Sequence, residues 1–114
     1  MLVKAHGDEY LFVADSSSQY TLPMDNIISI SLNSHNAVVN ASDGEHVLRI
    51  TATELMRLLP GCFLRCHRSH IVNLSKISGI YKNSIQLCDG SRLPLSRANA
   101  KVVKDAFLKL HTAP

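Results

Sequence analysis

The sequence predicts one mainly β domain, and two observations carry that expectation. Ile28, Ile30 and Leu32 alternate with serines, which is the period-2 pattern of a half-buried strand. Similar short apolar or alternating runs occupy residues 10–14, 27–32, 36–40, 46–50, 70–74, 77–81, 85–88 and 93–95. Stretches rich in Asn, Asp, Ser and Gly separate them at residues 33–36, 42–45, 82–84 and 89–91. Such residues favour turns, so we expect small antiparallel sheets.

A short internal helix is predicted just before Pro60. Thr51 and Glu54 have the spacing of a capping box, and Leu55, Leu58 and Leu59 follow as an apolar stripe. Pro60 and Gly61 should end this helix.

A second helix is predicted at the C-terminus, with Ser96 as its cap. Apolar residues recur there at helical spacing, at Ala100, Val103, Phe107 and Leu110. The lysines of this segment fall outside that stripe, so we expect the helix to dock by its apolar face.

Charge is distributed unevenly along the chain. Residues 1–60 hold three Lys or Arg against seven Asp or Glu, a net charge of −4, and residues 61–114 hold nine against two, a net charge of +7. A basic half of this kind suits a polyanion, because each cation that meets a phosphate releases condensed counterions. A solvated basic surface without a partner is the alternative.

Length and composition limit the class of protein. A chain of 114 residues fits one domain with its own core. No apolar run reaches the length of a membrane span and no signal peptide is recognisable, so we expect a cytoplasmic protein. The three cysteines, Cys62, Cys66 and Cys88, are odd in number and irregularly spaced, which favours reduced thiols over a disulfide framework.

Metal and catalytic sites are not expected. If Cys62, Cys66 and His70 lay on one strand, each would stand about 13 Å from the next, too far to share one ion. Ser69 lies beside His67 and His70, but neighbours on a strand face opposite ways. No nucleophile elbow, phosphate loop or zinc-protease motif is present. We therefore expect neither an enzyme nor a bound cofactor.

Two blocks of sequence resemble the LytTR family of bacterial DNA-binding domains. The first is FLRCHRSHIVNL at residues 63–74, and the second is LCDGSRLPLSR at residues 87–97, followed by a short final helix. The resemblance covers about residues 20–110 of a single domain spanning 1–114, with residues 1–19 as an N-terminal strand or a remnant of a linker. It implies an elongated arrangement of small antiparallel sheets, whose loops enter successive major grooves of double-stranded DNA.

The resemblance also implies roles for individual residues. His35, Arg68 and Arg97 are the base-reading candidates, since Arg and His side chains can hydrogen-bond base edges. Residues expected to contact the DNA backbone are Arg65, Ser69, Lys82, Asn99 and Lys101. His67 and Asn73 are expected to hydrogen-bond backbone within the sheet and brace the loop.

The implied biological setting is bacterial transcription regulation within a two-component system. Family members sit behind a receiver, sensory or membrane domain, so this chain is expected to be either the effector end of a longer regulator or a small stand-alone member. The implied targets are promoter sites arranged as direct repeats, with two copies of the domain bound. Two rival functions remain: a module that meets an acidic protein partner, and a redox or metal switch that uses Cys66 and Cys88.

Overall fold

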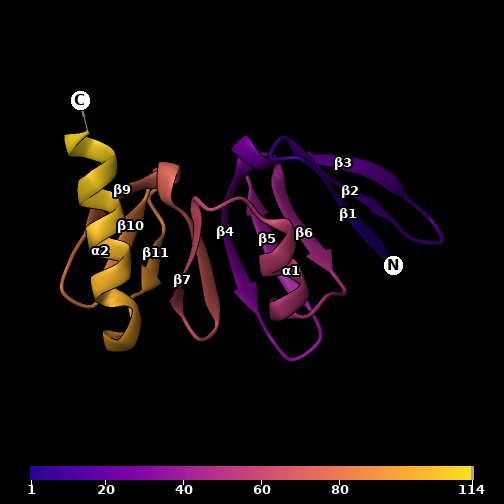
Figure 1. Ribbon diagram of the computed structural model, residues 1–114. Coiled ribbons are helices and arrows are strands. Elements are labelled where there is room, and N and C mark those ends of the chain that lie inside the picture. Colours follow the sequence, from indigo (N-terminus) through magenta and orange to yellow (C-terminus); the bar gives the residue numbers. More distant parts are fainter. Residues whose placement is uncertain (114) are drawn as a thin grey trace.

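The computed structural model describes residues 1–113 as three antiparallel sheets that follow one another along the molecule (Figure 1). The first sheet has the order β1-β2-β3, built from Leu2–His6, Tyr10–Ala14 and Gln19–Pro23. The second has the order β6-β5-β4-β8-β7, built from β4 (Ile27–Leu32), β5 (Ala37–Ala41), β6 (Gly44–Leu48), β7 (Phe63–His67) and β8 (His70–Asn73). The third pairs β9 (Ile77–Ile80), β10 (Ser84–Leu87) and β11 (Arg92–Pro94) in the order β11-β10-β9.

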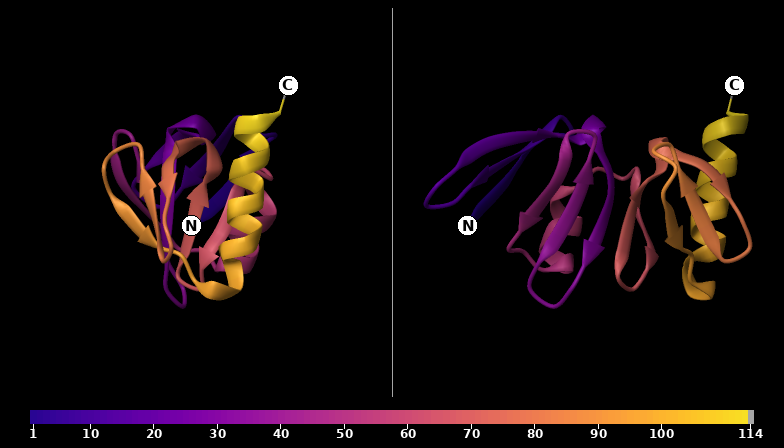
Figure 2. Two further views of the ribbon diagram at one scale, coloured as in Figure 1. Left: turned by 90° about the vertical axis from the view of Figure 1, so that its left-hand side faces the viewer. Right: turned by 180° about the vertical axis from the view of Figure 1, so that it is seen from behind.

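Two helices and two single 3₁₀ turns complete the chain. Helix α1 (Ala52–Leu58) joins the second sheet's strands β6 and β7, and α2 (Arg97–Thr112) follows β11. The 3₁₀ turns η1 (Met24–Asn26) and η2 (Leu74–Lys76) connect the sheets. Helix α2 and the first sheet stand at opposite ends of the longest dimension of 43 Å, which Figure 2 shows from two further sides. The mainly β, elongated fold predicted from the sequence is confirmed.

Two hydrophobic clusters hold the sheets together. The first joins the inner face of the first sheet to the second sheet and α1, around Leu11, Ile30 and Phe63. The second joins the other side of the second sheet to the third sheet and α2, around Val72 and Val103. Successive side chains of a strand point to opposite faces of the sheet. The five-stranded sheet therefore contributes apolar residues to both clusters and separates one from the other.

Residues 63–73 form a hairpin and not one continuous run. Strands β7 and β8 pair with Phe63 opposite Asn73 and His67 opposite His70. The single-strand geometry assumed for Cys62, Cys66 and His70 is therefore wrong. His67 and His70 lie across the hairpin from each other, with ring centroids 5.6 Å apart.

The helices differ from expectation in two details. Thr51 caps α1 as predicted, with its Oγ1 accepting from Glu54 N at 3.2 Å. The Ser96 side chain makes no such bond to the backbone of α2, and its Oγ accepts instead from the Asn99 side chain, at 2.7 Å from Nδ2. Leu110 is not part of the buried stripe and is 49% exposed.

Strand boundaries also differ at several places. Strands β3 and β7 are additional to the predicted runs, and β1 lies in the segment expected to be an N-terminal strand or a remnant of a linker. Strand β6 begins at Gly44, two residues before the predicted start. Gly44 has φ +129°, a conformation open to glycine, so the chain re-enters the sheet directly after the Ser42–Asp43 turn. Within residues 1–113, neither helix is long and apolar enough to cross a membrane.

The packing of the first sheet on the rest of the domain should contribute to the free energy of unfolding through apolar residues of its central strand, β2. Leu11 on β2 is fully buried in the first cluster, whereas Leu2 on β1 is 48% exposed. Leu11→Ala should lower the free energy of unfolding by about 2 to 5 kcal/mol, the cost of emptying a packed leucine site. Leu2→Ala is the matched control and should change it by less than about 0.5 kcal/mol. Equal values from urea denaturation would mean that this sheet does not pack on the rest of the domain.

Candidate nucleic-acid interface

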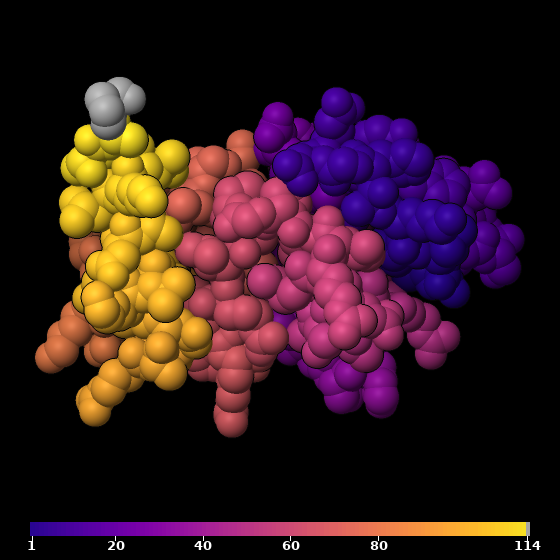
Figure 3. Space-filling model, in the orientation of Figure 1, coloured from indigo at the N-terminus to yellow at the C-terminus, as the bar shows by residue number. Residues whose placement is uncertain are grey.

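Three connecting segments gather along one edge of the molecule. They are the β4–β5 turn (residues 33–36), the β7–β8 turn (residues 68–69) and the segment that leads from β11 into α2 (residues 95–97). All three lie at the lower edge in Figure 1 and in both views of Figure 2. In the space-filling view they project downward from that edge (Figure 3). We refer to these three segments together as the loop edge.

Backbone hydrogen bonds tie the segments of the loop edge to one another. Leu32 N, at the end of β4, donates to the Ser69 carbonyl at 2.8 Å, which joins the first turn to the second. Ser96 N donates to the Cys66 carbonyl at 2.9 Å, which joins the start of α2 to β7. The relative positions of the three loops are thus set by backbone bonds, which leaves their long side chains free.

The β4–β5 turn presents His35. Asn33 closes the turn, accepting from Asn36 N at its Oδ1 at 3.0 Å and donating its own N–H to the Asn36 carbonyl at 3.0 Å. The imidazole of His35 is exposed at the tip of this closed turn.

The β7–β8 turn is held by side chains of its own strands. Arg65 Nη2 donates to the Arg68 carbonyl at 2.7 Å, and Ser69 N donates to His67 Nδ1 at 3.1 Å. Because Nδ1 accepts, the neutral His67 ring carries its proton on Nε2. The Arg68 side chain is exposed beyond this braced turn.

Asn73 fixes the far end of the same hairpin. It is 2% exposed, and its Nδ2 donates to the Ile27 carbonyl at 2.8 Å. Its Oδ1 accepts from Ser75 N at 3.1 Å and from Ser75 Oγ at 2.8 Å. A buried amide with these bonds is satisfied and holds β8 against the start of β4.

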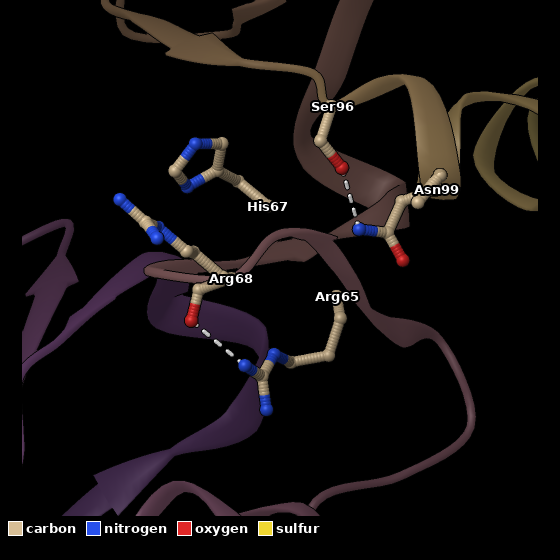
Figure 4. A pocket seen from close by; sticks show the side chains of 6 residues that line it. Arg65, His67, Arg68, Ser96 and Asn99 are labelled. Carbon is tan, nitrogen blue, oxygen red and sulfur yellow. Dashed lines mark hydrogen bonds between the residues drawn. The ribbon is translucent and has the colours of Figure 1, made fainter.

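A pocket of about 410 Å³ lies between the β7–β8 turn and the start of α2. In Figure 4, His67 and Arg68 lie on one side of it, and Ser96 and Asn99 lie on the other. Its complete lining is Arg65, His67, Arg68, Ser96, Ala98 and Asn99. These residues come from two parts of the chain about thirty positions apart, so sequence reasoning did not identify Ser96 and Ala98 as site residues.

Three further predicted contacts belong to the third sheet and α2. Arg97 is exposed in the first turn of α2, and Lys82 is exposed in the β9–β10 turn. Lys101 is exposed on α2, where its Nζ lies 2.9 Å from Asp105 Oδ2. An ion pair this exposed contributes little to stability, so the Lys101 ammonium can exchange its partner at low cost.

The charges of the loop edge have little compensation. In the part of the chain that the structure describes, the ion pairs are His46 with Asp43 and Lys101 with Asp105. Beneath the pocket, burial and then the neighbouring His67 lower the pKa of His70. His70 is therefore neutral at pH 7, and the permanent positive charge of the loop edge comes from Arg68 and Arg97.

This arrangement is suited to binding a polyanion, whose negative charges repeat along an extended chain. It offers guanidinium, ammonium, imidazole and amide donors on rigidly held loops, and Arg groups can bind phosphate or a base edge through two parallel bonds. Among residues 1–113, no group of three or more His, Cys, Asp or Glu side chains is placed to hold a metal ion. The individual roles of the residues that the sequence singled out stay predictions.

Known proteins place the chain in a family. The LytTr DNA-binding domain model matches residues 17–108, from before β3 into α2. A solved structure described as the LytTr DNA-binding domain of a methyl-accepting/DNA response regulator from Bacillus cereus is similar, with a TM-score of 0.75 and 25% sequence identity. That similarity covers 87% of this chain and 96% of the other. No curated protein matches the chain. The chain belongs to the LytTR family of DNA-binding domains.

Proposed function

We propose that this domain binds a specific double-stranded DNA sequence through its loop edge, in the cytoplasm, as the effector domain of a bacterial transcriptional regulator. The observation that carries the proposal is the alignment of three backbone-tied loops on one edge of an elongated molecule. The longest dimension is 43 Å, and one turn of B-DNA is about 34 Å long. The three loops belong to the part of this length that the second and third sheets occupy, and they are proposed to enter successive major grooves on one face of the duplex.

His35, Arg68 and Arg97 are the proposed base readers. Each is exposed and each belongs to a different segment of the loop edge. An arginine binds guanine O6 and N7 through two donors, and a histidine donates to or accepts from a base edge. Three readers on three loops would sample three positions of the site.

Phosphate contacts are assigned to the groups between those readers. Ser69, Asn99 and Lys101 lie beside the pocket or on the helix that borders it, and Lys82 lies in the next turn. Arg65 has one donor committed to the Arg68 carbonyl, but a guanidinium has five N–H groups. Arg65 therefore combines bracing of the turn with contact to the backbone.

The proposal includes two copies of the domain on promoter sites arranged as direct repeats. It also includes control by a receiver or sensor domain. In both cases the base-reading surface would remain the loop edge.

Selection of binding sites from a random duplex pool tests the function. The wild-type protein should enrich a motif of short elements. Arg97→Ala should lose the preference at one base position and cost about 1 to 3 kcal/mol on the selected site. Arg57→Ala removes an exposed arginine from the last turn of α1, which is not one of the three loop-edge segments, and should return the wild-type motif. Absence of any enriched motif with the wild type would contradict sequence-specific binding.

Lys101 should behave differently from Arg97. Lys101→Ala should weaken specific and random duplexes by the same factor, and it should reduce the salt dependence of log K by about 0.9. Measurement of affinity between 50 and 200 mM salt on both duplexes separates the two behaviours. A change in the ratio of specific to random affinity would make Lys101 a reader and not a phosphate contact. An affinity for duplex DNA that does not change with salt concentration would favour an acidic protein partner as the ligand.

The thiols should have no part in binding. Burial raises the pKa of Cys66 to about 11, so Cys66 stays protonated and unreactive in the folded protein at pH 8. Cys88 is exposed and should be alkylated by iodoacetamide, as mass spectrometry of the digested protein would show. The alkylated protein should retain its DNA affinity. Loss of affinity together with modification of Cys66 would instead support a redox switch.

A further inference from the structure

The solvent face of the third sheet carries an arrangement that the proposed base readers do not use. On this face Gln86 of β10 is opposite Gly79 of β9 and Arg92 of β11. Tyr81, directly after β9, is 50% exposed. The side chains of Tyr81, Gln86 and Arg92 contact one another across the three strands.

Gly79 allows the ring of Tyr81 to lie across the strand. A Cβ placed on Gly79 would stand 2.9 Å from Tyr81 Oη and 3.1 and 3.2 Å from two ring carbons. Contacts so short require movement of the ring. The absence of a side chain at position 79 therefore lets an aromatic surface form on the outside of the sheet.

Arg92 lies on that surface. Its guanidinium carbon is 4.9 Å from the centroid of the Tyr81 ring, within the range of a cation–π contact. Nη1 donates to Ser84 Oγ at 3.2 Å, and Nη2 lies 3.4 Å from Gln86 Oε1. Tyr81 Oη lies 3.4 Å from the same Gln86 oxygen.

All of these partners are neutral. Neither ion pair found among residues 1–113 includes Arg92. The guanidinium is thus held in position by a ring, a hydroxyl and an amide, while its charge is not neutralised. An ordered arginine with spare donors is prepared for a phosphate, since less side-chain freedom is lost when it binds.

We propose that Arg92, supported by Tyr81, binds a phosphate of the DNA backbone just outside the base pair read by Arg97. The inference rests on the proposed function and extends the contact surface by one element. The β9–β10 turn, which carries Lys82, is tied to the segment before α2 because Leu95 N donates to the Asn83 carbonyl at 3.0 Å. This continuity favours DNA over an acidic protein as the partner of Arg92.

Two duplexes and two variants test the assignment. One duplex ends at the base pair assigned to Arg97, and the other continues about half a helical turn, roughly five base pairs, beyond it. At about 0.15 M salt, Arg92→Ala should bind the longer duplex about fivefold more weakly, the factor that corresponds to about 0.9 of a released counterion. The slope of log K against log salt should fall by about the same 0.9, and affinity for the shorter duplex should not change.

Arg57→Ala is the matched control, since it removes an exposed arginine from α1 and should leave both affinities at the wild-type value. Tyr81→Phe keeps the ring and should retain the wild-type affinity for the longer duplex. Tyr81→Ala removes the ring and should weaken that affinity, but by less than Arg92→Ala does. Thermal melting of each variant establishes that it is folded, and the dependence on duplex length is a readout that a purely structural role of Arg92 would not produce.

The outcomes separate this inference from the proposed function. If the wild type binds both duplexes and Arg92→Ala has the same affinities and salt slopes, the phosphate contact is refuted while the proposed function stands. If the wild type binds neither duplex, both are overturned. Unchanged duplex affinity together with weaker binding to an oligoglutamate peptide would refute the DNA contact in favour of an acidic protein partner.

Discussion

The β7–β8 hairpin is the element on which the rest of the domain depends, because both hydrophobic clusters and the loop edge are built on it. Phe63 and Ile71 belong to one cluster, and Cys66 and Val72 belong to the other. The hairpin also carries both carbonyls that receive the backbone bonds of the neighbouring loops. Loss of its register would turn every side chain to the opposite face. The interior and the loop edge would then be disrupted together.

The hairpin also shows why the sequence predicts the fold only in part. Strands bounded by Asn, Asp or Gly turns could be recognised, but β7 turns into β8 through Arg68 and Ser69, without any Asn, Asp, Gly or Pro. This turn is stabilised by the side chains of Arg65 and His67. Strand β3 ends in Pro23, a residue that a sheet accepts at an edge strand but that argues against a strand in a sequence.

The sequence singled out individual candidate residues, whose roles stay predictions, but not the assembly that they form. The family resemblance indicated Arg68 and Arg97, and both are exposed on the loop edge. The pocket between them depends on a backbone bond from Ser96 to Cys66, a non-local contact that no local pattern encodes. The same limit explains the error at Leu110. Helical spacing places this residue on the apolar face, but only the packing of distant elements decides whether anything covers it, and it is 49% exposed.

Neutral bracing explains how a basic surface can be both ordered and available. Carboxylates would hold arginines in place, but each would cancel a charge that a polyanion needs. Residues 61–114 contain two acids among nine cations, and the loop edge instead uses carbonyls, a hydroxyl and an imidazole to fix its turns. The cost is mutual repulsion among the cations, which salt screens over about 10 Å. Bound phosphates, which carry the opposite charge, would remove that repulsion, so a polyanion would stabilise this surface more than a neutral ligand would.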